Sequence, residues 1–234
     1  MESQLPKKIR YTNRWFCYLD LLGFRNLVQS KDIEQVLPIY EEALSHLKNA
    51  AQNKARQGIM FSWFSDTFIL YSKSGKAEDF ALLEQAGRLF FRELIKNEIP
   101  VRGALTYGKL YSQQERNIFI GPALIDAYHY GEGQDWLGFV LTPSAITQLT
   151  AVGIPATERL NYRKVTDPAV LKPGVEGPVY AFCFGDGSVQ GKNRYLAPLE
   201  SMRKKAGATQ ASKYEKTIEF LNSHNQVGGW KSTA

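Results

Sequence analysis

The chain has 234 residues, of which 44% are hydrophobic and 22% charged, and its formal net charge is +6. This composition is ordinary for a globular protein with a substantial core. No apolar run approaches the roughly 20 residues that span a bilayer, and residues 1–14 lack the apolar centre of a signal peptide. Cys17 and Cys183 lie in apolar runs where buried, reduced thiols are expected. We therefore expect a cytoplasmic protein without a membrane partner.

The positive net charge predicts an anionic partner. The basic residues are scattered along the chain, and only Arg203, Lys204 and Lys205 form a tight cluster. Such a cluster is more often a solvated helix face than a nucleic-acid patch, whereas a basic pocket for a nucleoside triphosphate accounts for the charge at least as well. Nucleic acid is therefore disfavoured as a partner.

Apolar periodicity and the positions of glycine and proline predict strands alternating with helices. Strands are expected at residues 15–21, 59–64, 67–72, 101–107, 109–112, 137–141, 157–166 and 177–184. Helices are expected at residues 32–57, 77–97, 144–149 and 211–222, with a further helix from about residue 121. Gly108 is expected to turn the strand before it back onto a short partner. The order strand–helix–hairpin–helix–strand in the first half predicts a ferredoxin-like α+β fold, with a central, mostly antiparallel sheet flanked by helices.

The chain is long enough for one large domain with extensions at both ends. We expect a basic N-terminal extension at residues 1–14 and a folded domain at 15–184. A C-terminal extension at 185–226 is expected to pack on the domain or cover its site as a lid, followed by a disordered tail at 227–234.

Two aspartates, Asp20 and Asp66, each lie inside an apolar run that is typical of a buried strand. A buried carboxylate is costly unless a cation or a metal ion compensates its charge. In the predicted fold the first strand and the hairpin lie side by side, so the two aspartates would be neighbours. Together they would form an oxygen-ligand site for divalent cations, as in two-metal phosphoryl chemistry. The alternative is that each aspartate caps a turn through its own side chain.

Several segments resemble the motifs of class III nucleotidyl cyclases. Residues 18–24 resemble the first metal motif, and 64–66 resemble the hairpin with the second metal aspartate, with Ser65 where glycine is usual. Residues 102–108 and 138–144 resemble later strands of that family. Over residues 118–128 the amino-acid sequence is most similar to the bacterial pyrimidine (uridylate or cytidylate) cyclases of the Pycsar anti-phage system. The likeness covers about the first 150 residues.

The resemblance implies that residues 15–184 are a cyclase catalytic domain, which converts UTP or CTP to the 3′,5′-cyclic monophosphate and pyrophosphate. Members of the family act as head-to-tail homodimers with their sites at the interface. The product would be a second messenger for anti-phage defence that reaches a downstream effector by diffusion. The alternative is a catalytically degenerate, cyclase-like domain that binds a nucleotide as a sensor.

The resemblance also implies the metal site. Asp20 and Asp66, helped by the backbone carbonyl of Leu21, would hold two Mg²⁺ or Mn²⁺ ions. Gly23 and Phe24 would present backbone N–H groups to phosphate.

Arg25, beside that turn, would contact the β- or γ-phosphate, or would be a solvated helix side chain. The family's usual helix asparagine and arginine are replaced here by Ile125 and His129. A protonated His129 would donate to phosphate, but with an unperturbed pKa near 6.5 it is a weaker fixed charge than arginine. Arg102 therefore becomes a candidate for stabilising the transition state, with a strand-end salt bridge as its alternative role.

The base-reading lysine–aspartate pair of many adenylate cyclases is also missing, since Ser62 and Ile118 fall near those positions. This argues against ATP as the substrate. A pyrimidine would leave space that Tyr107, Tyr111 or Trp63 would fill.

Overall fold

The structure, a computed structural model, describes residues 10–55, 58–155, 161–185 and 194–225. The strands are β1 (Thr12–Leu21), β2 (Ile59–Phe64), β3 (Thr67–Ser72), β4 (Val101–Gln113), β5 (Ile118–Ile120), β6 (Phe139–Leu141), β7 (Tyr162–Lys164) and β8 (Tyr180–Phe182). The α-helices are α1 (Phe24–Ser30), α2 (Ile33–Ala55), α3 (Ala77–Lys96), α4 (Pro122–Glu132), α5 (Pro143–Ala151), α7 (Leu196–Lys205) and α8 (Ala208–Asn225).

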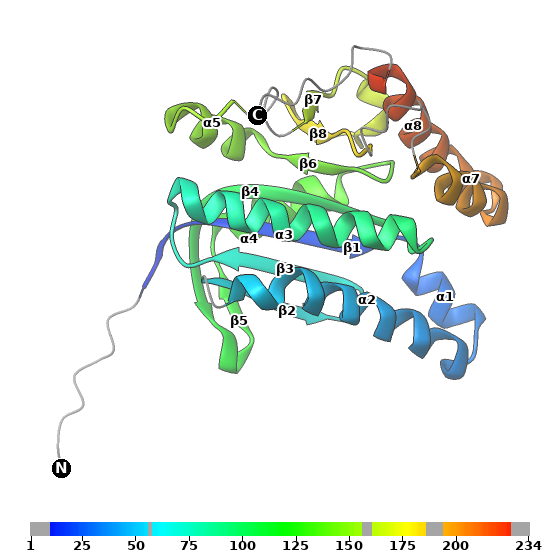
Figure 1. The fold of residues 1–234 in the computed structure, drawn as a ribbon, viewed down its shortest axis with the longest axis horizontal. Helices are drawn as coiled ribbons and strands as arrows, with labels where there is room; N and C mark the ends of the chain where they lie inside the picture. Colours follow the sequence, from blue (N-terminus) through cyan, green and yellow to red (C-terminus); the bar gives the residue numbers. More distant parts are fainter. Residues whose placement is uncertain (1–9, 56–57, 156–160, 186–193, 226–234) are drawn as a thin grey trace.

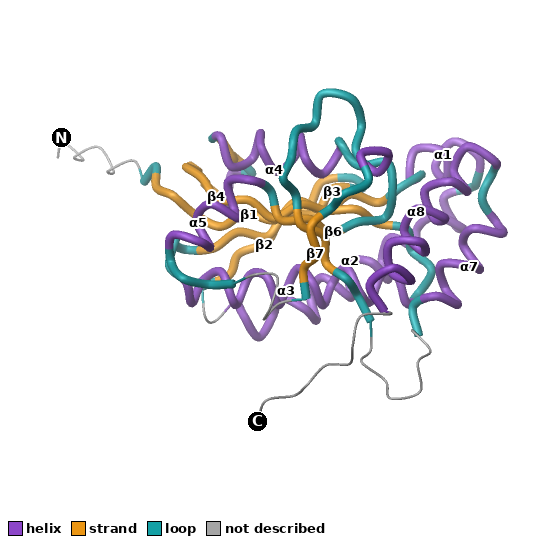
Figure 2. The backbone as a smooth tube through the Cα atoms, turned by 90° about the horizontal axis from the view of Figure 1, so that it is seen from above, coloured by secondary structure: helices purple, strands orange, loops and turns teal. Residues whose placement is uncertain are grey.

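The strands form one 8-stranded sheet in the order β2-β3-β1-β4-β6-β8-β7, with β5 paired to β4. The pair β4–β6 is parallel, and the other pairs are antiparallel. Helices α2 and α3 cover one face and α4 the other (Figures 1 and 2). This confirms the predicted α+β fold with a mostly antiparallel sheet flanked by helices.

Both faces of β1 are buried, which explains why this strand reads as a continuous apolar run. Trp15, Cys17 and Leu19 point into the main core with α2 and α3, whereas Phe16 and Tyr18 pack in a second cluster with α4. Because side chains alternate across a strand, Asp20 belongs to the α4 side. Its carboxylate therefore faces α4 rather than the main core.

The predicted turn at Gly108 is wrong. Strand β4 runs unbroken, and its register with β1 pairs Gly108 with Arg14. A Cβ atom on Gly108 would lie 3.4 Å from the backbone nitrogen of Ala123, an ordinary van der Waals distance, so the start of α4 packs directly on this position of the strand. The turn comes later, at the short 3-10 helix Gln114–Arg116 that leads to β5.

The second half differs from the prediction in detail. β7 and β8 are three residues each, shorter than expected, and residues 157–160 of the expected strand 157–166 lie outside the described residues. Helix α7 was not predicted as an element. Its residue Leu199 joins the main core, and Trp136 packs edge-on against Phe220 of α8 at a ring distance of 4.8 Å.

The C-terminal helices α7 and α8 therefore pack on the sheet-bearing part of the chain, beside α1 (Figure 1). The expected disordered tail, 227–234, lies outside the described residues. Among the helices that the structure describes, none has the length and apolarity to cross a bilayer.

Candidate active site

The two aspartates lie at the same end of the sheet. Asp20 is the penultimate residue of β1, where it pairs with Thr67 of β3 and Arg102 of β4. Asp66 lies in the tight turn between β2 and β3. Its neighbour Ser65 takes a left-handed backbone conformation with a φ of 54°, which costs a serine more than a glycine.

Both aspartates line one cleft of about 410 Å³. Its walls come from the end of β1, the β2–β3 turn, α1, α4, the loop before β8, and α8. The lining residues are Tyr18, Asp20, Leu21, Leu22, Gly23, Phe24, Arg25, Asn26, Asp66, Arg102, Tyr128, Glu132, Lys172, Gln210 and Lys213. The sequence predictions Asp20, Asp66, Gly23, Phe24 and Arg25 are thus brought together.

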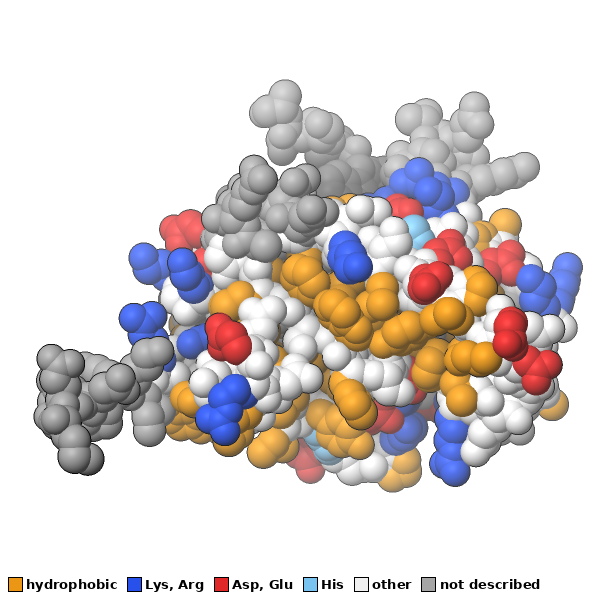
Figure 3. Space-filling view, turned by 90° about the horizontal axis from the view of Figure 1, so that it is seen from below, with side chains coloured by type: hydrophobic (Ala, Val, Ile, Leu, Met, Phe, Trp, Pro, Cys, Tyr) orange, Lys and Arg blue, Asp and Glu red, His pale blue; other side chains and the backbone are white. Residues whose placement is uncertain are grey.

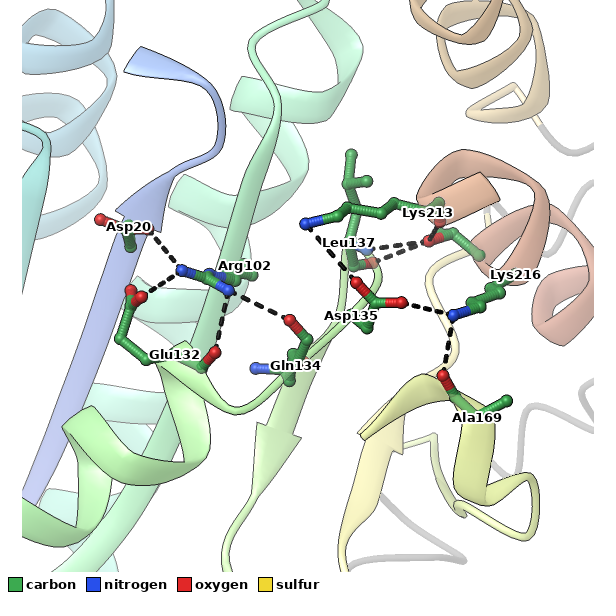
Figure 4. A network of polar contacts seen from close by, with 10 residues as sticks. Asp20, Arg102, Glu132, Gln134, Asp135, Leu137, Ala169, Lys213 and Lys216 are labelled. Atoms are coloured by element: carbon green, nitrogen blue, oxygen red, sulfur yellow. Dashed lines mark hydrogen bonds and ion pairs between the residues drawn. The ribbon is translucent and has the colours of Figure 1, made fainter. Parts of the chain in front are cut away.

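Arg102 lies beneath this cleft and is 6% exposed. Its Nη2 atom is 3.2 Å from Oδ2 of Asp20 and also contacts the carboxylate of Glu132. Its Nη1 atom donates to the backbone carbonyls of Glu132 and Gln134, each at 3.0 Å (Figure 4). The guanidinium is therefore committed to groups of the protein, and it fixes the carboxylate of Asp20 against the end of α4.

Asp20 is the electrostatic centre of the cleft. Burial, followed by the negative charge of Glu132, raises the pKa of Asp20 to about 7, although Arg102 opposes the shift and Asp66 adds to it. Carboxylates crowded in this way favour the uncharged form unless a cation is added. A divalent cation beside Asp20 and Asp66 would therefore offset a real electrostatic cost.

Tyr18 holds Glu132 in place. Its hydroxyl donates to Oε1 of Glu132 at 3.1 Å, and its ring packs edge-on against Tyr128 at 5.8 Å. Burial, then the charge of Asp20, raises the pKa of Tyr18 well above its ordinary range, so the phenol stays a hydrogen-bond donor.

The donor set fits Mg²⁺ or Mn²⁺. Asp20 and Asp66 offer carboxylate oxygens, and the carbonyl of Leu21 follows Asp20 directly at the end of β1. The described residues contain no group of three or more His, Cys, Asp or Glu side chains arranged to hold a metal ion. Mg²⁺ is commonly held by one or two protein carboxylates together with waters and substrate phosphates, so the oxygen donors present are compatible with such an ion.

The turn after β1 is shaped for close approach. Gly23 has a left-handed φ of 77°, and no atom lies within 4 Å of where its Cβ would be. The exposed side chain of Arg25 borders the same open space. This side of the cleft is therefore accessible to a bulky anion.

His129 and Tyr107 are not part of this cleft. His129 is exposed on α4, with its ring edge-on to Tyr130 at 5.2 Å. Tyr107 packs against Trp15 at a ring distance of 4.7 Å, five residues along β4 from Arg102. Ile125 is 69% exposed on α4. Within one protomer the predicted site residues His129 and Tyr107, and the replacement Ile125, are not among the residues that line the cleft of the aspartates.

Ser62 of β2 lies beside the residue that precedes Ile118. Oγ of Ser62 in β2 lies 2.9 Å from Oδ1 of Asn117, which directly precedes Ile118 of β5. Nε2 of Gln114 donates to the carbonyl of Phe61 at 3.0 Å. These contacts join β2 to the β4–β5 connection through uncharged groups.

Sequence reasoning did not assign every residue that lines the cleft, and the charged or polar ones that it missed include Glu132, Lys172, Gln210 and Lys213. A signal for Glu132 existed, because an arginine at the start of a buried strand requires carboxylate partners. No local sequence pattern indicates that Lys213 lies near Asp20, because the two residues are close to opposite ends of the chain.

Large hydrophobic side chains are exposed near the site. Those on α1, α2 and β2 are Val28, Ile33, Leu37, Trp63 and Phe64, and those on β5 and α4 are Ile120, Ile125 and Tyr128. Figure 3, which views the side of the molecule where β2 and α2 lie, shows hydrophobic side chains gathered in a band across that face. Exposed apolar surface of this kind is typical of a protein interface.

Solved structures with the same fold are nucleotide cyclases. The adenylyl cyclase CyaB from P. aeruginosa superposes with a TM-score of 0.54 at 13% identity, over 75% of this chain and 95% of that one. The guanylyl cyclase Cya2 superposes with a TM-score of 0.53 at 13% identity, over 74% of this chain and 92% of that one. A third structure is the catalytic core of a rhodopsin-guanylyl cyclase with converted specificity, in complex with ATPαS. It superposes with a TM-score of 0.56 at 11% identity, over 73% of this chain and 95% of that one. No protein-family model matches the sequence, and no curated protein matches it significantly. The chain thus has the class III nucleotidyl cyclase fold.

Proposed function

We propose that this protein is a nucleotidyl cyclase that converts UTP or CTP to the 3′,5′-cyclic monophosphate. The observation that carries the proposal is the pair Asp20 and Asp66, which line one open cleft at the same end of a class III cyclase sheet. A domain that only binds a nucleotide has less need of two such carboxylates.

In the proposed reaction the ribose 3′-oxygen attacks the α-phosphorus. The bond from that phosphorus to the α,β-bridging oxygen breaks, pyrophosphate leaves, and the hydroxyl proton is lost to solvent. Asp20 and Asp66 would hold two Mg²⁺ or Mn²⁺ ions with the carbonyl of Leu21. When bound, these ions would lower the pKa of the 3′-hydroxyl and offset charge on the pyrophosphate.

The chain's own groups orient the substrate. Gly23 and Phe24 would approach the phosphates with backbone N–H groups, and Arg25 would contact the β- or γ-phosphate. We assign Arg102 a positioning role, because its guanidinium already binds Asp20, Glu132 and two carbonyls. It would hold the carboxylate of Asp20 at the angle that metal binding needs.

The proposed enzyme is a homodimer with composite sites. His129 is exposed on α4 outside its own cleft, and Ile125 and Tyr128 beside it are exposed hydrophobic residues. A head-to-tail partner would cover this surface and bring its His129 to the phosphates of the neighbouring site. An isolated protomer would then be inactive.

The base would be a pyrimidine. Ser62 and Ile118 fall near the positions where a lysine–aspartate pair would read adenine, and the hydroxyl of Ser62 instead bonds Asn117, the neighbour of Ile118. UTP is slightly preferred over CTP. A role in anti-phage defence, with an effector reached by the diffusing product, rests on the resemblance of residues 118–128 to pyrimidine cyclases.

A nucleotide sensor is the second candidate. The replacements at Ile125 and His129 favour it, because an apolar side chain cannot hydrogen-bond a ribose and a histidine carries less charge than an arginine. Such a sensor would keep the cleft and bind a triphosphate without turnover.

The test is incubation of the purified protein with ATP, GTP, CTP and UTP separately, in the presence of Mn²⁺, with products identified by mass spectrometry. We expect cyclic UMP or cyclic CMP from the wild type and none from Asp66→Asn. A cyclic purine nucleotide would contradict the base assignment. A bound triphosphate without any cyclic product would overturn the enzyme and favour the sensor.

A further inference from the structure

We propose that the C-terminal helix α8 is part of the active site, and that Lys213 on this helix, together with Lys172, binds the terminal phosphates of the substrate. This inference rests on the proposed function, since it names the groups that hold the polyphosphate. Nothing in the sequence had assigned a role to either lysine.

Lys213 is placed over the cleft by α8. Its side chain is 17% exposed, and it lines the same cleft as Asp20, Asp66 and Arg25. Figure 4 shows its ammonium extended from α8 toward the side where Arg102 and Asp20 lie. The lysine is therefore directed into the cleft rather than out to solvent.

The helix is anchored firmly enough to hold Lys213 there. One turn later, Thr217 accepts a hydrogen bond from the backbone N–H of Leu137 at 3.0 Å. The same hydroxyl donates to the carbonyl of Lys213 at 2.9 Å. Trp136 packs on Phe220 of the next turn. These contacts fix α8 against the chain segment that leads into β6.

Lys213 belongs to a group with surplus positive charge. Its Nζ atom is 3.5 Å from Oδ1 of Asp135, whereas Nζ of Lys216 is 2.5 Å from Oδ2 of the same carboxylate. Lys216 also donates to the carbonyl of Ala169 at 2.8 Å. One carboxylate neutralises one lysine, and Lys216 holds it more closely. The charge of Lys213 is thus available to an anion.

Lys172 is presented to the cleft by a pinned loop. Its backbone N–H donates to the carbonyl of Gly133 at 2.7 Å, and the N–H of Asp135 donates to the carbonyl of Val170 at 2.9 Å. Burial, followed by the positive charge of Arg102, lowers the pKa of Lys172. An anion arriving beside Lys172 would relieve this repulsion.

Lys213, Lys172 and Arg25 therefore surround the cleft with three cations, in addition to the buried Arg102. Charge-assisted hydrogen bonds from such groups to phosphate oxygens are the strong kind. A monophosphate next to the aspartates would not need all three, whereas a triphosphate extends far enough to use them.

The test compares Lys213→Ala with the matched control Lys216→Ala. Lys216 lies one turn away on the same helix and pairs with the same carboxylate, Asp135, but does not line the cleft. Calorimetry with Mg²⁺ would measure the binding of inorganic tripolyphosphate, UTP and UMP. We expect Lys213→Ala to weaken tripolyphosphate and UTP about tenfold and UMP less than twofold. Lys216→Ala should change each less than threefold, and Lys213→Arg should retain most of the affinity.

A sign test separates substrate binding from a structural role. Asp135→Asn removes the carboxylate that competes for Lys213, so tripolyphosphate should bind as tightly or more tightly, although α8 loses its two ion pairs to this residue. Three results would each overturn the inference. Asp135→Asn could bind tripolyphosphate more weakly than the wild type, Lys213→Ala and Lys216→Ala could lose affinity equally, or Lys213→Ala could bind it with unchanged affinity.

The two proposals can fail separately. If the wild type forms a cyclic product and Lys213→Ala binds tripolyphosphate with unchanged affinity, only the proposed role of α8 is contradicted. If no cyclic product forms but tripolyphosphate binding still depends on Lys213, the role of α8 as a polyphosphate site survives and the cyclase proposal fails.

Discussion

The backbone N–H of Leu21 donates a hydrogen bond to the backbone carbonyl of Asp66 at 3.1 Å. The turn that carries Asp66 is thereby tied to the end of the strand that carries Asp20. Because this tie uses main-chain atoms, replacing either aspartate side chain leaves it intact. The backbone positions of the two aspartates at this end of the sheet are thus held by the main chain.

Asp20→Asn and Asp66→Asn should therefore remove metal binding while the fold is kept. We expect Mn²⁺ to raise the melting temperature of the wild type in a concentration-dependent way, because a ligand that binds only the native state stabilises it. The shift should be largely lost in either variant. Differential scanning fluorimetry with an Mn²⁺ titration measures the shift in melting temperature. Asp167→Asn, at an exposed position before β8, is the control. An equal shift in Asp66→Asn would contradict the proposed ligand pair.

Arg102 should be a large contributor to stability. Arg102→Met leaves the buried carboxylate of Asp20 and the partly exposed carboxylate of Glu132 without their cation. Breaking a buried pair costs about 3–5 kcal/mol, and the exposure of Glu132 places the expected loss at the lower end of that range. Urea denaturation would measure the loss in the free energy of unfolding.

The double variant Arg102→Met with Glu132→Gln provides the control. Removing one of the two stranded charges should make the double variant less destabilised than the sum of the single changes, because the residues are in direct contact. Additive effects would contradict the coupling between Arg102 and Glu132.

The fold and the pairing of the aspartates could be predicted because they depend on local patterns. The apolar run through β1 and the two strands around Asp66 identify neighbouring strands, and the ferredoxin-like order then brings Asp20 near Asp66. Gly108 misled the prediction because a glycine in a strand can equally mark a turn or a close contact. Here it lies within the continuous strand β4, next to Ala123 at the start of α4.

The rest of the cleft could not be predicted because it depends on tertiary contacts. Glu132 reaches Arg102 only when α4 packs across the sheet. Lys213 reaches the cleft only because Thr217 and Phe220 dock α8 beside β6. No spacing in the sequence encodes these approaches.

Gly131 in α4 should tolerate no side chain. A Cβ atom there would lie 2.5 Å from Cδ1 of Tyr18, whose hydroxyl holds Glu132. Gly131→Ala should therefore lower the free energy of unfolding by about 1–3 kcal/mol, although alanine alone favours a helix. Gly207→Ala, where no atom lies within 4 Å of the Cβ position, should stay within about 0.5 kcal/mol. Similar values for the two variants would contradict the close packing of α4 on Tyr18.

The composite site can be tested by mixing two inactive variants. Asp66→Asn removes a group that each cleft takes from its own protomer, and His129→Ala removes one that it would take from the partner. Each homodimer should lose activity. In a mixed dimer one site carries both changes and the other carries neither, so mixing after subunit exchange should restore cyclic nucleotide formation.

Equimolar mixing should recover roughly a quarter of the wild-type rate, because random exchange makes half of the dimers mixed and each of these has one intact site. Product formation followed by mass spectrometry gives the rate. Ile125→Glu provides the control, since a charge on this exposed apolar surface should prevent pairing and abolish recovery when built into both partners. Full inactivity of the mixture despite confirmed exchange would mean that His129 acts in its own protomer or that the site is not shared.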